Sequence, residues 1–149
     1  MVSDVEAAVE AFSSGKPVMI FDSSFREQET DLLWPASAAT PGIMRRLRKD
    51  CGGLLFLAIG NEVGELFGLP WLQDIHSHPK LVEENPVLSE LITDDLKYDS
   101  KSAFTLSLNH RDTFTGITDK DRALTTRRFG ELTDELFFNK SDKSYARKA

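Results

Sequence analysis

Apolar side chains recur every three or four positions in three segments of the chain, the spacing that places them along one face of an α-helix. These segments cover residues 3–15, 40–50 and 118–137, and each begins with a serine or a threonine. Such side chains are favoured N-caps because their oxygen accepts a hydrogen bond from a backbone N–H of the first helical turn. The pattern therefore predicts three capped helices, and a shorter helix is expected at residues 61–67.

The third of these helices carries two further signals. Asp121 follows Thr118 by three positions, the spacing of a capping box, in which each side chain binds the backbone N–H of the other residue. Ala123, Leu124 and Leu132 lie on the apolar face of the predicted helix. We therefore expect these three side chains to point into the core.

Three shorter apolar runs have the character of β-strands. Residues 17–21 form a short apolar run that ends in a polar loop, which predicts a buried strand. Residues 54–59 are apolar throughout, which is typical of a central strand covered on both faces. Residues 103–108 alternate between apolar and polar, which predicts a strand with one wet face. Residues 69–100 are interrupted by prolines and show no clear pattern.

The mixture of helices and strands is typical of one layered domain of the α/β class, arranged as a mixed α+β sandwich. A length of 149 residues corresponds to about one domain. Residues 138–149 contain four basic residues and one acidic residue, whereas the whole chain has a net charge of −6. We therefore expect a domain at residues 1–137 and a basic connecting tail at residues 138–149.

Composition narrows the classes of function. The longest apolar run, residues 54–59, is far shorter than the roughly 20 residues that cross a bilayer. Acidic residues near the amino terminus do not suit a secretory signal. Cys51 is the single cysteine, so an internal disulfide is excluded and a reducing, cytoplasmic compartment is expected. The negative net charge disfavours binding to nucleic acid or to a membrane surface, so a small molecule is the expected partner.

Three acidic residues alternate along the segment between two apolar runs, at Glu27, Glu29 and Asp31. On an extended backbone their carboxylates would lie on one face, roughly 7 Å apart, and would repel one another unless a cation, a proton or a bound polyol compensated. A hard divalent cation such as Mg²⁺ suits carboxylate oxygens. Arg26 beside them could stabilise negative charge on a substrate. A solvated acidic loop without a ligand is the alternative explanation for this spacing.

Four segments resemble the motifs of one enzyme family. Asp22 followed by Arg-Glu-Gln-Glu-Thr-Asp at residues 26–31 resembles the signature of the 3,4-dihydroxy-2-butanone 4-phosphate synthases, in which an aspartate precedes Arg-Glu-x-Glu-x-Asp. Residues 48–54 resemble the family's helix-to-strand junction, residues 68–70 its next turn, and residues 115–122 its second signature. The order and the spacing of the four segments also agree with the family.

The resemblance covers about residues 3–137, and the middle of the chain looks most like the archaeal, stand-alone branch of the family. It implies a mixed α/β sandwich that forms a homodimer. It also implies the family's reaction, in which D-ribulose 5-phosphate becomes L-3,4-dihydroxy-2-butanone 4-phosphate and formate during riboflavin biosynthesis. The chain is therefore expected to be a magnesium-dependent lyase.

The resemblance also implies roles for individual residues. Glu27 corresponds to the family's ligand for Mg²⁺ or Mn²⁺ and lies in the substrate site. Arg26 and Asp31 correspond to positions that contact the sugar phosphate, and Glu29 and Asp31 are the expected catalytic carboxylates. Thr115 corresponds to a threonine near the substrate, where its hydroxyl and the adjacent glycine N–H could donate to an anionic oxygen.

The chain departs from the family pattern in two places. Phe56 occupies a position where many members have a cysteine beside the substrate, and a phenylalanine cannot exchange a proton. The family also continues into an Arg-x-Gly-His-Thr-Glu segment that supplies a second metal ligand and much of the phosphate pocket, and this pattern does not occur in the 149 residues. We therefore expect the chain to be a shortened form of the family domain and to be inactive alone.

Two other interpretations compete with this expectation. The chain could be a non-catalytic module that uses the same fold for dimerisation or for binding a sugar phosphate. The histidines at positions 76, 78 and 110 could replace the missing metal ligand, but their irregular surroundings favour structural or solvent-facing roles. A role in nucleic-acid binding is disfavoured because the basic residues fit the solvated faces of helices.

Overall fold

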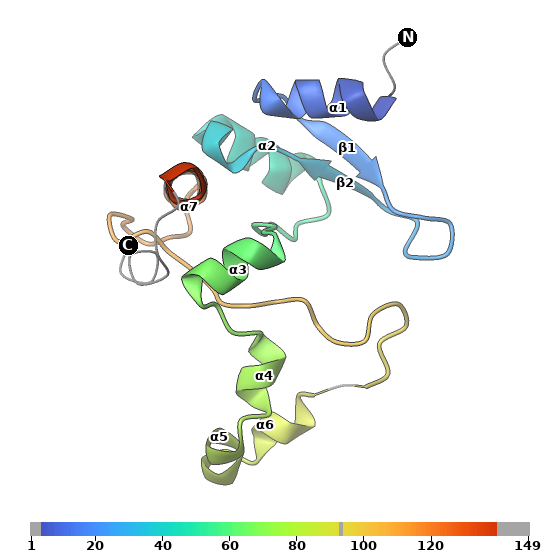
Figure 1. The fold of residues 1–149 in the computed structure, drawn as a ribbon, viewed down its shortest axis with the longest axis vertical. Helices are drawn as coiled ribbons and strands as arrows, with labels where there is room; N and C mark the ends of the chain where they lie inside the picture. Colours follow the sequence, from blue (N-terminus) through green and yellow to red (C-terminus); the bar gives the residue numbers. More distant parts are fainter. Residues whose placement is uncertain (1–3, 93, 140–149) are drawn as a thin grey trace. The chain divides into compact units, whose positions relative to one another are not determined.

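A computed structural model describes residues 4–92 and 94–139, with side chains described as far as residue 137 (Figure 1). The described chain divides into two compact units. The first contains residues 4–58 and 108–139, and the second contains residues 59–107 apart from residue 93. Both predicted signature segments belong to the first unit: residues 26–31, which contain the acidic loop, and residues 115–122, which contain the turn at Thr115, called the threonine turn below.

The first unit begins with a helix that packs beside a hairpin. Helix α1 spans Asp4–Ser13, strand β1 spans Val18–Phe21 and strand β2 spans Thr30–Leu33 (Figure 1). The two strands pair antiparallel, with Val18 opposite Leu33. The predicted helix at residues 3–15 and the strand at residues 17–21 are thus confirmed, although Ser3 lies outside the described residues.

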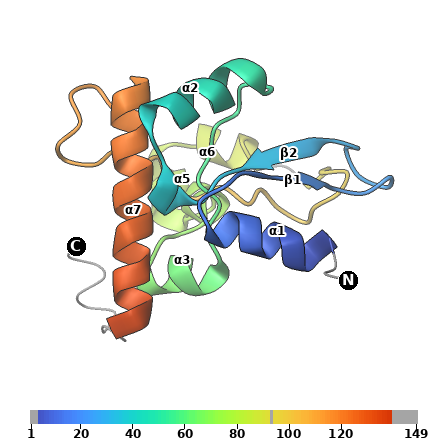
Figure 2. The same ribbon diagram turned by 90° about the horizontal axis from the view of Figure 1, so that it is seen from above.

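Two further helices belong to this unit, together with the short 3₁₀ helix η1 at Ala36–Ala38. Helix α2 spans Pro41–Asp50 and helix α7 spans Asp119–Asn139, and α7 contacts both α2 and η1 (Figure 2). Two of the three predicted hydroxyl caps lie within the described residues, and both are present. The Thr40 hydroxyl accepts a hydrogen bond from the Ile43 N–H at 3.2 Å, and the Thr118 hydroxyl accepts one from the Asp121 N–H at 3.1 Å.

The core of the first unit lies where α2 and α7 meet. Ala39, Met44 and Ala123 are buried together, and the partly buried Ile43, Leu47 and Leu55 pack against them. Ala123 therefore points inward as predicted, whereas Leu124 and Leu132 are only half-buried. The contact between α7 and η1 is close, because a Cβ atom added to Gly130 would lie 2.8 Å from the Ser37 backbone nitrogen. This core fixes the first turn of α7, which carries part of the second signature.

The second unit consists of short helices and one long segment, residues 94–107, that forms neither helix nor strand. Its helices are α3 at Asn61–Phe67, α4 at Leu72–His76, α5 at Pro79–Glu84 and α6 at Val87–Glu90. Helix α3 confirms the helix predicted at residues 61–67. Residues 94–107 contact α4 in two places. The Leu72 N–H donates to the Phe104 carbonyl at 2.9 Å, and the ammonium of Lys101 lies 5.0 Å from the centre of the Trp71 ring.

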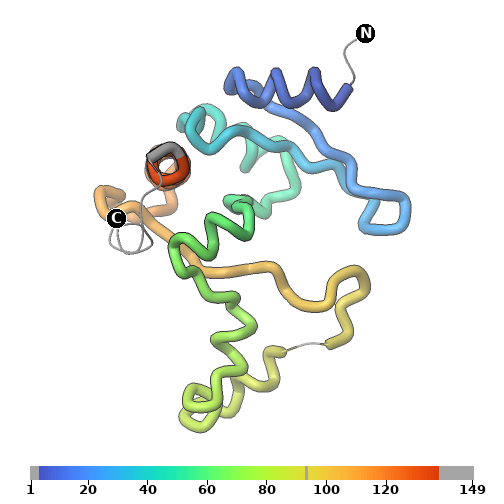
Figure 3. The backbone as a smooth tube through the Cα atoms, in the orientation of Figure 1, coloured from blue at the N-terminus to red at the C-terminus, as the bar shows by residue number. Residues whose placement is uncertain are grey.

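Two of the predicted strands are wrong. Residues 54–59 and 103–108 run without helical coiling, yet neither segment is a strand (Figure 3). A strand needs a hydrogen-bonding partner, and the sheet that the described residues form contains only β1 and β2. Leu54, expected at the centre of a covered sheet, has 72% of its surface exposed. Strand β1 does form but is not buried, since Met19 is 75% exposed.

The described elements, helices with a small antiparallel sheet, confirm the mixed α/β class. Helix α7 continues past residue 137 to Asn139, and the rest of the predicted basic tail lies outside the described residues, so the domain boundary there stays a prediction. In the part of the chain that the structure describes, every helix is too short or too polar to cross a membrane.

Candidate functional site

The acidic loop joins β1 to β2 and is folded as a tight turn. The Arg26 N–H donates to the Ser23 carbonyl at 3.1 Å, and the side-chain amide of Gln28 donates to the Ser24 carbonyl at 3.2 Å. Gln28 has a φ of 59°, a left-handed value that is uncommon for a residue other than glycine. The segment is therefore not extended between Glu27 and Glu29, and the alternation in the sequence does not translate into one continuous strand face.

The loop is closed at its base by Asp22. The Asp22 N–H donates to the Glu29 carbonyl at 3.2 Å, and the Asp22 carboxylate accepts a hydrogen bond from the Glu29 N–H, also at 3.2 Å. This pair of bonds extends the hairpin ladder by one residue beyond each strand. The Asp22 carboxylate therefore has a clear structural role in shaping the loop.

Arg26 and Glu27 form an ion pair at the tip of the loop. The Nε atom of Arg26 lies 3.3 Å from an Oε atom of Glu27, and the two side chains are 41% and 43% exposed. The carboxylates of Glu27, Glu29 and Asp31 are all at the surface. Glu27 and Glu29 belong to the loop, whereas Asp31 lies in β2 opposite Ile20. The loop and the start of β2 thus present one guanidinium and three carboxylates to the solvent, a set of groups that a charged polyol could contact.

The loop suits a magnesium ion only through a small number of protein ligands. Magnesium typically binds one or two carboxylates and completes its octahedron with water and substrate oxygens. The exposed carboxylate of Glu27 fits that requirement. Across residues 4–92 and 94–139, no group of three or more His, Cys, Asp and Glu side chains is placed to hold a metal. The residues therefore fit an open, water-rich site and not a closed cage.

The three histidines belong to other segments than the acidic loop. His76 ends α4, and His78 is the residue before α5. His110 lies in a turn, where its Nδ1 atom accepts a hydrogen bond from the Asp112 N–H at 3.2 Å. His76 is therefore part of a helix and not of an irregular segment as the sequence suggested, and the absence of a metal role for the three histidines stays a prediction.

The second signature folds as a turn around the carboxylate of Asp121. This carboxylate accepts hydrogen bonds from the backbone N–H groups of Phe114 at 3.3 Å, Thr115 at 2.9 Å and Gly116 at 3.0 Å. Asp121 is buried, with 6% of its surface exposed. The bond from the Thr115 N–H is the main cause that holds the pKa of the Asp121 carboxyl below its usual range, and burial opposes it in part.

This arrangement differs from the sequence-based expectation in two ways. The Asp121 carboxylate binds the preceding turn, and not the Thr118 N–H that a capping box would give it. The Thr115 hydroxyl and the Gly116 N–H were expected to be free to donate to a bound anion, yet both donate to Asp121, the hydroxyl at 3.3 Å. Glycine is needed at position 116, where φ is 76°.

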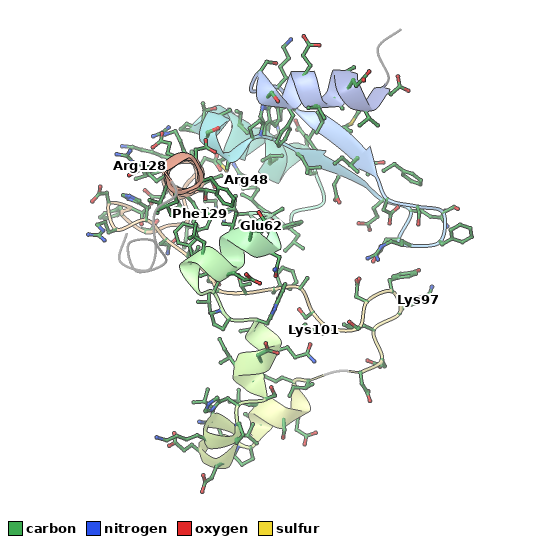
Figure 4. The ribbon with its side chains drawn as sticks, in the orientation of Figure 1. Arg48, Glu62, Lys97, Lys101, Arg128 and Phe129 are labelled. Carbon is green, nitrogen blue, oxygen red and sulfur yellow. The ribbon has the colours of Figure 1, made fainter. Side chains whose placement is uncertain are left out.

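Arg48 anchors the start of α7 to α2. Its guanidinium binds both carboxylate oxygens of Asp119, at 3.1 and 3.0 Å (Figure 4). This bidentate bond raises the pKa of Arg48 and is the main cause that lowers the pKa of Asp119. Arg48 and Asp119 belong to the two segments, 48–54 and 115–122, that resemble family motifs, so the structure brings these motifs together.

A hollow of about 350 Å³ lies beside the same turn. Its lining comes from the segment just before the second signature, the start of α2 and the first turns of α7, namely Pro41, Asp112, Phe114, Lys120, Asp121, Ala123, Leu124 and Arg127. None of the predicted site residues of the acidic loop lines it.

The fold agrees with that of a known class of enzyme. A crystal structure of 3,4-dihydroxy-2-butanone 4-phosphate synthase in complex with two magnesium ions matches the chain with a TM-score of 0.62 and 23% sequence identity. The match covers 85% of this chain and 50% of the other. The first unit, with its acidic loop and threonine turn, thus belongs to a mixed α/β fold of the kind that these synthases have.

Sequence comparison assigns the family itself. The family model of 3,4-dihydroxy-2-butanone 4-phosphate synthase matches residues 6–142, and the chain belongs to this family. The synthase of Archaeoglobus fulgidus is 46% identical over 142 residues, which are 94% of this chain and 58% of the relative. That of Methanosarcina mazei is 42% identical over 134 residues, 89% of this chain and 53% of the relative. Both relatives are archaeal, as the sequence resemblance indicated, and the chain spans a little over half of their length.

Proposed function

We propose that the chain provides the acidic substrate loop of a 3,4-dihydroxy-2-butanone 4-phosphate synthase. The single observation that carries this proposal is the family match across residues 6–142, which includes both signatures. The reaction would convert D-ribulose 5-phosphate to L-3,4-dihydroxy-2-butanone 4-phosphate and formate, a step of riboflavin biosynthesis. The enzyme would be a lyase.

The loop residues would share the binding of the substrate. Arg26 would contact the sugar phosphate and neutralise part of its charge, and Asp31 would accept hydrogen bonds from sugar hydroxyls. Glu27 would hold Mg²⁺, or Mn²⁺ in its place, within an otherwise water-filled coordination sphere. When bound, such an ion would polarise the carbonyl and hydroxyl oxygens of the sugar.

The exposed carboxylates can also move protons. The reaction requires removal of a proton next to a carbonyl, loss of a hydroxyl group, carbon migration and release of formate, so it needs an acid and a base in more than one step. Glu29 and Asp31 are the carboxylates that would serve, one accepting a proton while the other donates. Glu29 is held in place by the two hydrogen bonds between its backbone and Asp22. These bonds would restrict the position of the Glu29 carboxylate relative to the bound substrate.

Residues 1–149 by themselves would be inactive or very slow. They lack the Gly-His-Thr-Glu pattern that the family resemblance associates with the second metal ligand and the phosphate pocket. A single carboxylate retains magnesium poorly because the ion gives up its water reluctantly. The complete enzyme would act as a cytoplasmic homodimer on a small molecule, without nucleic acid or membrane.

Phe56 favours a second candidate function. Its side chain is 58% exposed and stands where many family members have a cysteine, so a proton-transfer group is missing at that position. A sugar-phosphate-binding or dimerisation module without turnover would need no such group.

Formate release separates the two functions. The gene product that contains these 149 residues should release formate from ribulose 5-phosphate when Mg²⁺ is added, and a chelator should stop the release. Binding of ribulose 5-phosphate in a calorimeter without formate release would instead support the non-catalytic module. Absence of both binding and release would refute the synthase and the sugar-phosphate-binding module.

A further inference from the structure

The turn at residues 114–117 directs its hydrogen-bond donors at a single buried carboxylate. Three successive N–H groups and the Thr115 hydroxyl all donate to Asp121. Successive backbone N–H groups of this kind form a concave site for an anion, and here the anion is part of the protein. A phosphate group would therefore have to displace Asp121 before it could use these donors.

The same contacts define what the Thr115 hydroxyl can still do. A hydroxyl has one proton to donate and two lone pairs to accept with. The ionised Asp121 carboxylate can only accept, so the hydroxyl proton of Thr115 goes to it, at 3.3 Å. The Ile117 N–H donates to one lone pair of the same oxygen, also at 3.3 Å. One lone pair is left, and it can take a hydrogen bond only from a donor.

Ribulose 5-phosphate offers two kinds of group to such an oxygen. Its phosphate oxygens are acceptors when ionised and carry negative charge, so they would meet both a lone pair and the nearby Asp121 carboxylate unfavourably. Its hydroxyl groups are donors as well as acceptors and are uncharged. The chemistry of the turn therefore suits a sugar hydroxyl and not the phosphate.

We propose that Asp121 is a positioning residue that fixes the Thr115 hydroxyl as an acceptor for a hydroxyl group of the sugar, away from the phosphate. The assignment rests on the proposed function and on the position beside the substrate that the family resemblance implies for Thr115. It gives the second signature a different task from the acidic loop, where Arg26 is the group suited to the phosphate.

The surroundings hold Asp121 firmly enough for this role. Its N–H donates to the Thr118 hydroxyl, and its neighbour Asp119 is bound by Arg48 through two hydrogen bonds. Gly116 adopts a φ of 76°, and a Cβ atom added there would overlap the side chain of Asn109. The start of α7 thus fixes the carboxylate of Asp121, and the packing of Gly116 against Asn109 fixes the turn.

The test combines substitutions in the gene product that contains this sequence. Thr115→Val removes the hydroxyl and should lower kcat/KM for ribulose 5-phosphate by about three- to tenfold, the range expected for one neutral hydrogen bond. Inhibition by inorganic phosphate should change by less than about twofold, because the turn does not contact that group. Thr115→Ser keeps the hydroxyl and should restore most of the lost kcat/KM.

Asp121→Asn tests the positioning role through coupling. It should also lower kcat/KM, but it should add little to Thr115→Val, because both substitutions act through one hydroxyl. Thr113→Val is a matched control, since that hydroxyl donates to the His110 carbonyl at 2.8 Å and makes no contact with Asp121. The effect of Asp121→Asn should be the same with and without the Thr113 substitution.

The outcomes separate this inference from the proposed function. A wild-type protein that binds no ribulose 5-phosphate would overturn both. If the wild type is active, an equal effect of Asp121→Asn with and without Thr115→Val would show a general structural role and overturn the positioning assignment alone. A large loss of phosphate inhibition in Thr115→Val would place the phosphate at the turn and would also overturn it.

Discussion

Gly130→Ala should fail to stabilise the protein, although alanine is normally favoured over glycine inside a helix. Alanine is favoured over glycine inside a helix by about 1 kcal/mol, so Gly130→Ala in an isolated helix would be stabilising. In this structure Gly130 faces η1. An added Cβ atom would lie 2.8 Å from the Ser37 backbone nitrogen, 2.9 Å from the Ala36 Cβ atom and 3.1 Å from the Ala36 carbonyl carbon. The obstacles are mainly backbone atoms, which cannot rotate away.

The net effect follows from two opposing terms. Favourable contacts between carbon atoms occur at about 3.5–4.0 Å, so α7 or η1 would have to move by roughly half an ångström or more. Overpacking of this kind costs about 1–3 kcal/mol. After the gain in helix propensity of about 1 kcal/mol, we expect Gly130→Ala to change the free energy of unfolding by between about zero and 2 kcal/mol in the destabilising direction.

Gly42→Ala provides the matched control in the same unit. Gly42 lies in α2, and an added Cβ atom would meet only the Thr40 hydroxyl, at an ordinary distance of 3.8 Å. Urea unfolding followed by helical circular dichroism should show Gly42→Ala to be neutral or stabilising and Gly130→Ala to be less stable than it. If Gly130→Ala stabilised the protein as much as Gly42→Ala, the close packing of α7 on η1 would be refuted.

Substitutions at three further positions test one helix cap, the buried carboxylate and the ion pair between Arg48 and Asp119. Thr40→Ala removes the acceptor of the Ile43 N–H and should lower the free energy of unfolding by about 1 kcal/mol, whereas Thr40→Ser keeps the hydroxyl and should lose much less stability. Urea midpoints measure both variants, and an unchanged midpoint for the alanine variant would contradict the cap. Asp121 has a lowered pKa in the folded protein, so it contributes stability above the unfolded value of 3.8 and loses that contribution as the pH falls through the lower, folded value. Asp121→Asn should therefore be less stable than wild type at neutral pH, and the gap should shrink in unfolding measured at acid pH; a gap that did not depend on pH would argue against an ionised acceptor. Arg48→Met removes the ion pair with Asp119 and should lower the thermal midpoint at low salt. The difference in midpoint from wild type should be smaller in about 1 M salt, where charges are screened beyond about 3 Å. A difference that salt does not alter would show that the ion pair contributes nothing.

Helix starts could be read from the sequence because they depend on neighbours along the chain. The hydroxyls of Thr40 and Thr118 cap helices where the sequence placed them, since a cap needs only the following turn. The strands at residues 54–59 and 103–108 were predicted from the same kind of pattern and do not form. An apolar or alternating pattern favours an extended chain, but it does not identify the partner that must supply the hydrogen bonds.

In the candidate site, too, the sequence indicated local features but not the contacts between residues farther apart in the chain. The sequence singled out the acidic loop and Thr115, but it did not reveal that Asp22 closes the loop or that Asp121 gathers the turn before it. The spacing of Asp121 from Thr118 had a simpler explanation as a capping box, and that local signal concealed the longer-range one. An aspartate that follows a Thr-Gly pair by five residues is a signal that could have suggested the contact.

The role of Glu27 is tested most directly by one charge-neutralising substitution in the gene product that contains this sequence. Glu27→Gln should lower both the affinity for Mg²⁺, measured by calorimetry, and the rate of formate release from ribulose 5-phosphate. Glu10→Gln removes an equal charge from the exposed face of α1 and should alter neither quantity. If Glu27→Gln left metal affinity and formate release at the level of the Glu10 variant, the acidic loop would not be the metal-binding part of the substrate site.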